Sequence, residues 1–342
     1  MIKFFINTLI ILLASPVIAQ ETRDVLFDSN DPLKLAFGIS IKQIRDAKFD
    51  TVYFAHKLYF SGVSGKEDSI QMGVKRRGNF RLQKCYFPPL WIKIDKKKGM
   101  NTVFEGNRKL KLVMPCDSRL LSNDLIVREY LCYKLFQKIT SESFKAKLVD
   151  IDFTELRGRK SKTFQLKGIL IEDVSKTAKR LSGQVSKHAK VTPKALNDTC
   201  ALRFDLFQLL ISNTDFSKGF QHNSKLIYKN TKYVPLPYDF DMSGVVDAPY
   251  AVVSKVGENQ LPIESVTERY YRGFCASKET TEFVRGEFIS KEEQLSSLPD
   301  KLKGYLSDKD IEHLKSYLKE FFDILKNDNL FQREVLSKCR PR

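Results

Sequence analysis

The sequence predicts an α+β protein of two lobes, with a β-rich N-terminal lobe followed by a mainly helical C-terminal lobe. Short strand-like runs separated by turn residues fill the chain from about residue 35 to residue 115. Apolar stripes at helical spacing dominate the C-terminal part. A polar, basic stretch without a core pattern, residues 176–195, separates the two regions and is expected to be a linker.

The first 19 residues have the pattern of an export signal. Lys3 gives a positive start, "FFINTLIILLASPV" is an apolar run, and Val17 and Ala19 form a small-residue cleavage site. The run is too short to span a membrane comfortably, and no later segment is long and apolar enough to do so. We therefore expect residues 1–19 to be a cleaved signal peptide, and the protein to be secreted or periplasmic without a transmembrane segment.

The N-terminal lobe is expected to span residues 20–175. Its strands include "TVYFAHKLYF", "IQMGVKRRGNF", "KLKLVMP" and "TFQLKGILIED". One helix interrupts them, with Leu125, Cys132, Phe136 and Ile139 on a common face. Glu129 falls within that apolar stripe, so its carboxylate either reaches water at the rim or needs a partner.

The C-terminal lobe is expected to span residues 196–342. It opens with the helix "NDTCALRFDLFQLLI", which leads into the loop "NTDFSKGFQHN". A hairpin follows, "KLIYKNTKYVPL", with Asn230 near its turn. An amphipathic stripe that includes Ile311, Leu314 and Leu318 predicts a packing helix near the C-terminus.

The composition is strongly basic, with a formal net charge of +17. Such a surface attracts phosphates, acidic polymers or anionic membranes. The positive charges are scattered and form no long stripe, so nucleic-acid binding is unlikely. The sequence leaves the oligomeric state open.

The chain contains six cysteines, and an exported protein can form disulfides. Six cysteines allow fifteen pairings, and the sequence does not decide among them. Cys85 and Cys116 flank a strand-rich segment and are the best candidate pair. Cys132 and Cys200 lie within helical patterns and are candidate buried thiols.

Three polar positions follow one another after the long helix of the C-terminal lobe. Asp215 lies in the loop, Asn223 follows it, and the hairpin leads to Asp239 with Asp241 beside it. Phosphoryl transfer uses one aspartate to orient or deprotonate the acceptor, while an asparagine and a second aspartate hold metal ions on the phosphates. Neighbouring carboxylates such as Asp239 and Asp241 can also share the charge of a bound metal.

Four stretches together resemble the CotH kinase-like family, the atypical protein kinases of the spore-coat type: "VKRRGNF", "LIED", "NTDFSKGFQHN" and "YDFD". The resemblance covers roughly residues 72–244. It implies a two-lobed, protein-kinase-like fold, Mg²⁺ or Mn²⁺ and ATP as cofactors, and Asp215 as the catalytic aspartate. It also implies that Asn223 and Asp239 bind metal, with Asp241 as a second candidate. The chain departs from ordinary kinases in its longer Asp-to-Asn gap and in lacking a glycine-rich loop and an H-R-D triplet.

The N-terminal lobe offers candidate groups for a nucleotide. Arg76 and Arg77 can bind phosphate oxygens, or can form a basic surface turn. Lys93 can pair with Glu129, as a kinase lysine pairs with its helix glutamate, or can extend from an edge strand into water. On the resemblance, Glu172 ends the hinge behind the adenine.

Two functions are therefore expected. The first is an exported atypical kinase-like phosphotransferase that binds a metal-bound nucleotide and an exported protein substrate. The alternative is a non-catalytic binding or structural protein on the same fold. Compartments outside the cytoplasm hold little ATP, which favours the alternative or another phosphate donor. The retained Asp215, Asn223 and Asp239 favour the first.

Overall fold

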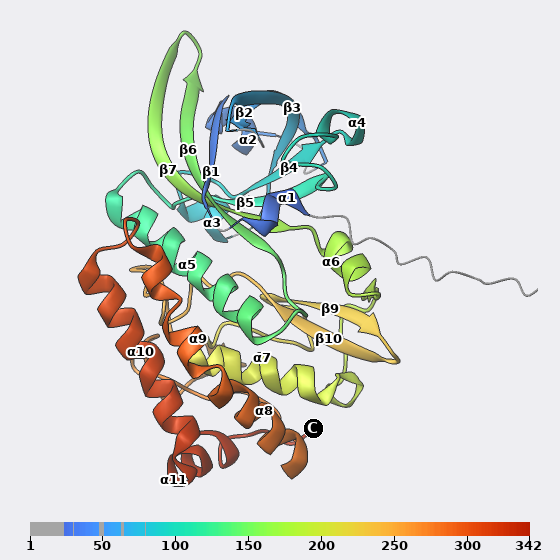
Figure 1. Ribbon diagram of the computed structural model, residues 1–342, viewed down its shortest axis with the longest axis vertical. Helices are drawn as coiled ribbons and strands as arrows, with labels where there is room; N and C mark the ends of the chain where they lie inside the picture. The colour runs from blue at the N-terminus through green and yellow to red at the C-terminus, as the bar shows by residue number, and fades with distance from the viewer. Residues whose placement is uncertain (1–23, 30, 48–50, 63–64, 79) are drawn as a thin grey trace, which may run out of the picture.

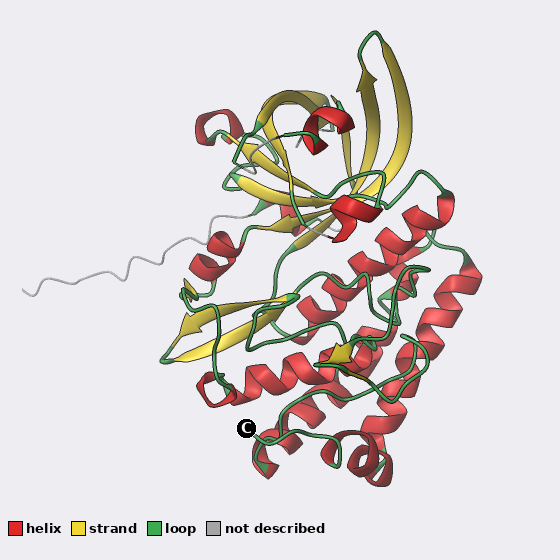
Figure 2. Ribbon diagram, turned by 180° about the vertical axis from the view of Figure 1, so that it is seen from behind, coloured by secondary structure: helices red, strands yellow, loops and turns green. Residues whose placement is uncertain are grey.

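The computed structural model describes residues 24–29, 31–47, 51–62, 65–78 and 80–342. Residues 1–19, the expected signal peptide, lie outside the described residues. Strands make up the upper part of the molecule and most helices the lower part (Figures 1 and 2).

The upper part is a closed barrel with the strand order β1-β2-β3-β4-β5-β7-β6. Its strands are β1 (Leu33–Ile39), β2 (Phe54–Ser61), β3 (Glu67–Arg76), β4 (Leu90–Ile94), β5 (Lys109–Val113), β6 (Ala146–Arg157) and β7 (Lys160–Glu172). Alternate residues such as Val74, Ile92 and Leu110 point inward and are buried. Short helices lie around the strands: α1 (Val25–Asp28), α2 (Ile41–Arg45), α3 (Phe80–Lys84) and α4 (Lys96–Gly99).

The predicted two-lobed, protein-kinase-like fold is wrong, because the strands close into a seven-stranded barrel. Closure comes from β1, which pairs in parallel with β6 from Leu33 opposite Val149 to Ile39 opposite Glu155. The period-two pattern of a strand shows which residues face inward, but it does not show which distant strand is the neighbour.

Helix α5 (Leu120–Ile139) joins the barrel to the helical part (Figure 1). Its buried apolar residues belong to the same cluster as Leu148 of β6, Ile169 of β7 and Phe207 of α7 (Asp198–Leu210). Glu129 is 1% exposed on this helix, so it does not reach water at a rim.

The helical part consists of α7 (Asp198–Leu210), α8 (Lys278–Ser290), α9 (Glu292–Ser296), α10 (Asp308–Lys326) and α11 (Asp328–Phe331). The hairpin β9 (Ser224–Lys229) and β10 (Lys232–Pro237) lies beside α7, between it and α6 (Val174–Arg180) (Figure 1). The short β8 (Gln184–Val185) adds to β9, and β11 (Lys255–Val256) pairs with β12 (Asn259–Gln260).

The segment expected to be an exposed linker, residues 176–195, is structured. It includes most of α6 (Val174–Arg180) and all of β8. Ala178, Leu181 and Val191 within it are buried. The sequence did not predict this burial, because the apolar residues of the segment are few, lie among lysines and follow no regular period.

Two disulfides are present among the described residues. The expected pair Cys85–Cys116 is formed, and Cys275 pairs with Cys339. Cys132 and Cys200 are buried free thiols, as predicted.

Candidate functional site

Asp215 lies in the loop that follows α7. His222 Nε2 is 2.7 Å from Asp215 Oδ1, and Asn223 Nδ2 donates to Asp215 Oδ2 and to the Asp215 carbonyl, both at 2.9 Å. The hydrogen bond to Asp215 raises the pKa of His222. The loop thus forms a compact group around one carboxylate.

Two buried contacts fix this loop to the helical part. Lys218 forms an ion pair with Asp205 of α7, and both side chains are 1% exposed. Arg272 donates to the carbonyl of Thr214, the residue before Asp215. Because both anchors lie within three residues of Asp215, they restrict where its carboxylate can point.

The β9–β10 hairpin places Asp239 beside this group. Ser224 pairs with Pro237, and the Tyr238 amide donates to the Asn223 carbonyl at 3.2 Å. The Asp239 amide donates to the hydroxyl of Tyr133 on α5 at 3.0 Å. The hairpin register therefore brings Asp239 next to Asn223, on the side of α5.

Both residues have left-handed backbone conformations, with φ of 46° at Asn223 and 66° at Asp239. Asn and Asp are the non-glycine residues that tolerate this region best. The backbone conformation by itself therefore favours Asn at position 223 and Asp at position 239, apart from any role in metal binding.

Asp241 faces a closed polar cluster behind Asp239. Tyr250 donates to Asp241 Oδ2 at 3.3 Å, and Arg81 Nη1 lies 3.6 Å from Glu129 Oε2. The four residues line an enclosed cavity of about 10 Å³, which is about the size of one water molecule. Asp241 is 6% exposed, so it is less available to an incoming metal than Asp239, which is partly exposed.

Burial is the main cause of the raised pKa values of the two carboxyl groups in this cluster. It raises the pKa of Glu129 to about 8, although the nearby charge of Arg81 opposes the shift. Burial, together with the charge of Asp239, raises the pKa of Asp241 to about 7. The pKa of Arg81 is raised: its burial opposes this, but Tyr250, Glu129 and the two aspartates outweigh burial.

This burial predicts a pH-dependent stability. Glu129 and Asp241 titrate together, and both hold protons more tightly in the folded chain than in the unfolded chain. Their stabilising contribution to the free energy of unfolding is complete below about pH 4, where both groups are protonated in the folded and in the unfolded chain. It is lost as the pH rises to the folded values near 7 and 8, because only the unfolded chain releases protons over that range.

Urea unfolding between pH 4 and pH 8, in the presence of a chelator, measures this dependence. Glu129→Gln cannot ionise, so the stability difference between wild type and variant should change across this range in favour of the variant at high pH. A difference that does not change with pH would show that Glu129 is ionised in the fold.

Two lysine side chains lie against Tyr238, the residue before Asp239. Lys111 of β5 is buried, and its Nζ lies 3.9 Å from the centroid of the Tyr238 ring. Burial and the charge of Arg77 lower the pKa of Lys111 well below its usual value, whereas Asp239 opposes this shift. Lys225 of β9 lies 5.7 Å from the same ring. The residues after β10 are thus flanked by positive charge.

Sequence reasoning missed Lys111, Lys225 and Arg81. Lys111 had a signal, since it lies between two leucines in the apolar run "KLKLVMP". Arg81 and Lys225 had none, because their roles depend on contacts with distant residues.

Two predicted groups do not reach this site. Arg76 Nη1 donates to the Arg45 carbonyl at 2.6 Å, which is a contact within the barrel region. The predicted pairing of Lys93 with Glu129 is wrong: Lys93 is exposed, with Nζ 5.6 Å from the Tyr53 ring centroid, and Arg81 is the cation beside Glu129. The charge of Arg77 does act at this site, because it affects the pKa values of Tyr238 and Lys111.

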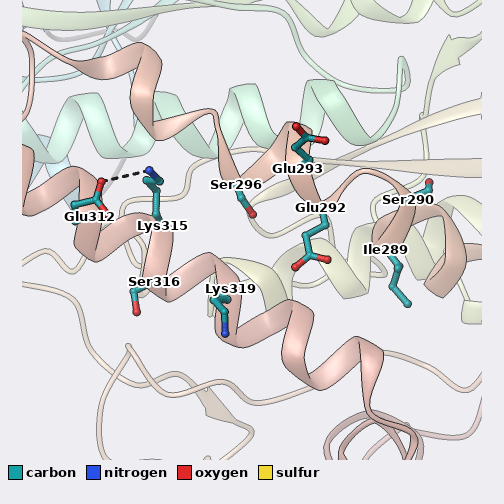
Figure 3. Close-up of a pocket in the computed structure, with 9 residues that line it drawn as sticks. All are labelled: Ile289, Ser290, Glu292, Glu293, Ser296, Glu312, Lys315, Ser316 and Lys319. Atoms are coloured by element: carbon teal, nitrogen blue, oxygen red, sulfur yellow. Dashed lines mark hydrogen bonds and ion pairs between the residues drawn. The ribbon is translucent and has the colours of Figure 1, made fainter.

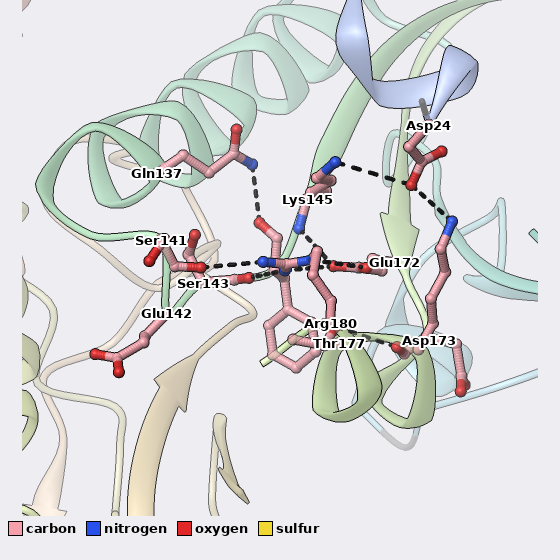
Figure 4. A network of polar contacts seen from close by, with 12 residues as sticks. Asp24, Gln137, Ser141, Glu142, Ser143, Lys145, Glu172, Asp173, Thr177 and Arg180 are labelled. Carbon is pink, nitrogen blue, oxygen red and sulfur yellow. Dashed lines mark hydrogen bonds and ion pairs between the residues drawn. The ribbon is translucent and has the colours of Figure 1, made fainter. Parts of the chain in front are cut away.

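Glu172 has a structural contact network of its own. Arg180 of α6 donates to its two carboxylate oxygens at 3.2 and 2.7 Å, and the Lys145 amide donates at 3.2 Å (Figure 4). Arg180 also donates to the Ser143 carbonyl. The side chain of Glu172 therefore ties α6 to the end of β7 and is not aimed at Asp215 or Asp239.

A large hollow of about 770 Å³ lies elsewhere, among α8, α9 and α10 (Figure 3). It is lined mainly by polar and charged side chains, including Glu293, Ser296 and Lys319. None of the residues discussed above lines it. The size of a hollow alone does not indicate a function, so we take the group around Asp215 and Asp239 as the candidate site.

The residues present fit a magnesium ion that is bound together with phosphates. Mg²⁺ is commonly held by one or two carboxylates and substrate oxygens while it keeps several waters. Asp239 supplies a carboxylate, and the hydrogen bonds of Asn223 to Asp215 use Nδ2, whereas a metal would bind Oδ1. No group of three or more His, Cys, Asp or Glu among the described residues could hold a metal by itself.

No protein-family model matches this chain, and no curated protein matches it. Across the part of the chain that the structure describes, no helix is long and apolar enough to cross a membrane.

Proposed function

We propose that this protein is an exported phosphotransferase that uses a metal-bound nucleotide. The observation that carries the proposal is the arrangement around Tyr238. Lys111 and Lys225 lie against its ring, the charge of Arg77 acts on it, and Asp239 follows it in the chain, beside Asn223 and Asp215. A nucleotide triphosphate needs cations and a metal on its phosphate oxygens.

Each residue has a role in this proposal. Asp239 and Asn223 would hold Mg²⁺ or Mn²⁺, and Lys111 and Arg77 would bind phosphate oxygens. The metal would neutralise charge on the transferred phosphoryl group. Asp215 would orient the acceptor hydroxyl of an exported protein, and its contacts with His222 and Asn223 set its direction.

The four motifs behind the CotH resemblance remain a prediction of family, and the two disulfides are compatible with an extracellular location. One observation favours the non-catalytic alternative. Both carboxylate oxygens of Asp215 already have protein partners, His222 and Asn223, so an acceptor would have to share or replace one of them.

The direct test uses the purified protein with Mg²⁺ or Mn²⁺ and ATP. At a hundredfold excess over Kd, ligand linkage stabilises a protein by about 2.7 kcal/mol, which for a protein of this size is roughly 4 °C in melting temperature. We expect that shift only with both metal and nucleotide, together with γ-phosphate transfer to the protein itself or to a co-exported protein. A shift without transfer would support the binding alternative. The absence of both the shift and the transfer would overturn the nucleotide site.

A further inference from the structure

Three strands, β3, β4 and β5, are neighbours in the barrel (Figure 1), and their outer face carries several lysines. In the strand register Lys75 lies opposite Trp91 and Trp91 opposite Lys111, while Lys93 lies opposite Lys109 in the next row. Residues two apart on a strand share a face, so these side chains all point out of the barrel. Arg77, two residues after Lys75, extends this face past the end of β3. We call this set the basic face: Lys75, Arg77, Trp91, Lys93, Lys109 and Lys111.

The basic face extends from the candidate site onto the exposed surface. At one end, Lys111 is buried beneath Tyr238. Its neighbour Trp91 is partly exposed, and Lys93 and Lys109 are exposed. A ligand that enters beside Tyr238, the residue that covers Lys111, can therefore continue along the strands to Lys109 and Lys93.

The chemistry of the face suits phosphate groups better than bases. Lys109 Nζ lies 4.0 Å from the Trp91 ring centroid, and the Arg77 guanidinium lies 5.7 Å from it. Lys93 similarly lies over Tyr53 at 5.6 Å. Proteins that bind single-stranded nucleic acid use open aromatic faces to stack bases, whereas the faces here are occupied by cations. Cations in a row along a surface favour a ligand with repeated negative charge.

We propose that the basic face binds a linear polyphosphate chain, longer than the triphosphate of a nucleotide, that enters the site at Lys111. This goes beyond the proposed function, because it requires neither a nucleoside nor phosphate transfer. It also names a second phosphate compound that the same cations can hold where ATP is scarce.

Trp91 provides the measurement, because it is the only tryptophan in the chain. A phosphate chain that draws Lys109 away from the ring should change the fluorescence of Trp91. We would titrate the protein with long-chain polyphosphate, tripolyphosphate, ATP and an oligothymidylate. Long-chain polyphosphate should bind at least about tenfold more tightly than tripolyphosphate, with a steeper salt dependence.

A double variant, Lys93→Gln/Lys109→Gln, should weaken polyphosphate binding about tenfold and reduce its salt dependence, but should leave tripolyphosphate binding nearly unchanged. The matched control is Lys57→Gln/Lys162→Gln. These two exposed lysines also lie over barrel aromatics, Tyr59 at 4.8 Å and Phe164 at 4.9 Å, and their loss changes the net charge equally. The control should bind polyphosphate like the wild type.

Equal affinity for long and short phosphate chains would overturn the proposal. So would equal loss in the two double variants, which would indicate attraction to net charge alone, or tighter binding of the oligothymidylate. Polyphosphate binding without any ATP-dependent shift would refute the proposed nucleotide site but leave this inference standing.

Discussion

Replacing Asp239 by asparagine is expected to abolish the Mg²⁺-dependent rise in melting temperature with ATP. Asparagine has nearly the same shape and tolerates the left-handed backbone at this position, where φ is 66°. The variant therefore removes the negative charge of one metal ligand with little strain. Because a metal ligand acts in the ground state, the loss should appear in binding itself.

Asp215→Asn should behave differently. In the proposed function Asp215 acts on the acceptor as transfer begins, so the variant should keep most of the thermal shift. Transfer should fall roughly 10²–10⁴-fold, which is the usual contribution of an acid–base group. Differential scanning fluorimetry and transfer of labelled γ-phosphate measure the two effects separately.

Asp152→Asn is the control, since Asp152 is an exposed aspartate on β6. It should retain both the shift and the transfer. If Asp239→Asn keeps the full metal-dependent shift, Asp239 is not a metal ligand. If Asp215→Asn loses the shift as well, Asp215 belongs to the binding site and the division of roles is incorrect.

The grouping of Asp215, Asn223 and Asp239 follows from local signals. A helix end, a loop and a tight hairpin at Asn230 bring these positions back together within a short stretch of chain. Such connections are largely determined by nearby residues, and so the sequence predicts them.

Nearby residues could not show which of the two lysines, Lys93 or Lys111, lies at the candidate site. Both alternate with buried residues on neighbouring strands and both point out of the barrel. Tyr238 covers Lys111 and leaves Lys93 exposed, and this cover comes from a hairpin more than a hundred residues later. Barrel closure by β1 and β6 is of the same kind, because it depends on pairing between distant segments.

The sequence also does not predict which residue is the partner of Glu129. Arg81 lies on α3, directly before the Cys85–Cys116 disulfide that joins this segment to the end of β5. Its guanidinium donates to the Met114 carbonyl and lies beside Glu129. A basic residue in a short polar helix gives no sign that it will be buried.

Arg81→Met is therefore expected to destabilise the protein strongly. Arg81 is 7% exposed, and its loss leaves Glu129 and Asp241 buried without their cation. Breaking a buried pair by removing one partner typically costs about 3–5 kcal/mol, and a protein of this size should lose roughly 4–7 °C in melting temperature. The cost should be smaller at pH 5 than at pH 8, because protonated carboxyls do not need the cation.

Two further variants distinguish this explanation from a general effect of losing an arginine. Arg119→Met removes the partner of Asp117 from a pair in which the Arg119 side chain is 76% exposed, so it should cost at most about 1 kcal/mol. Adding Glu129→Gln to Arg81→Met should recover part of the loss, giving a coupling of roughly 0.5–3 kcal/mol in a double-mutant cycle. Equal costs for the two arginines, or strict additivity of the two changes, would mean that Arg81 does not offset the charge of Glu129. Urea unfolding at the two pH values provides all of these quantities.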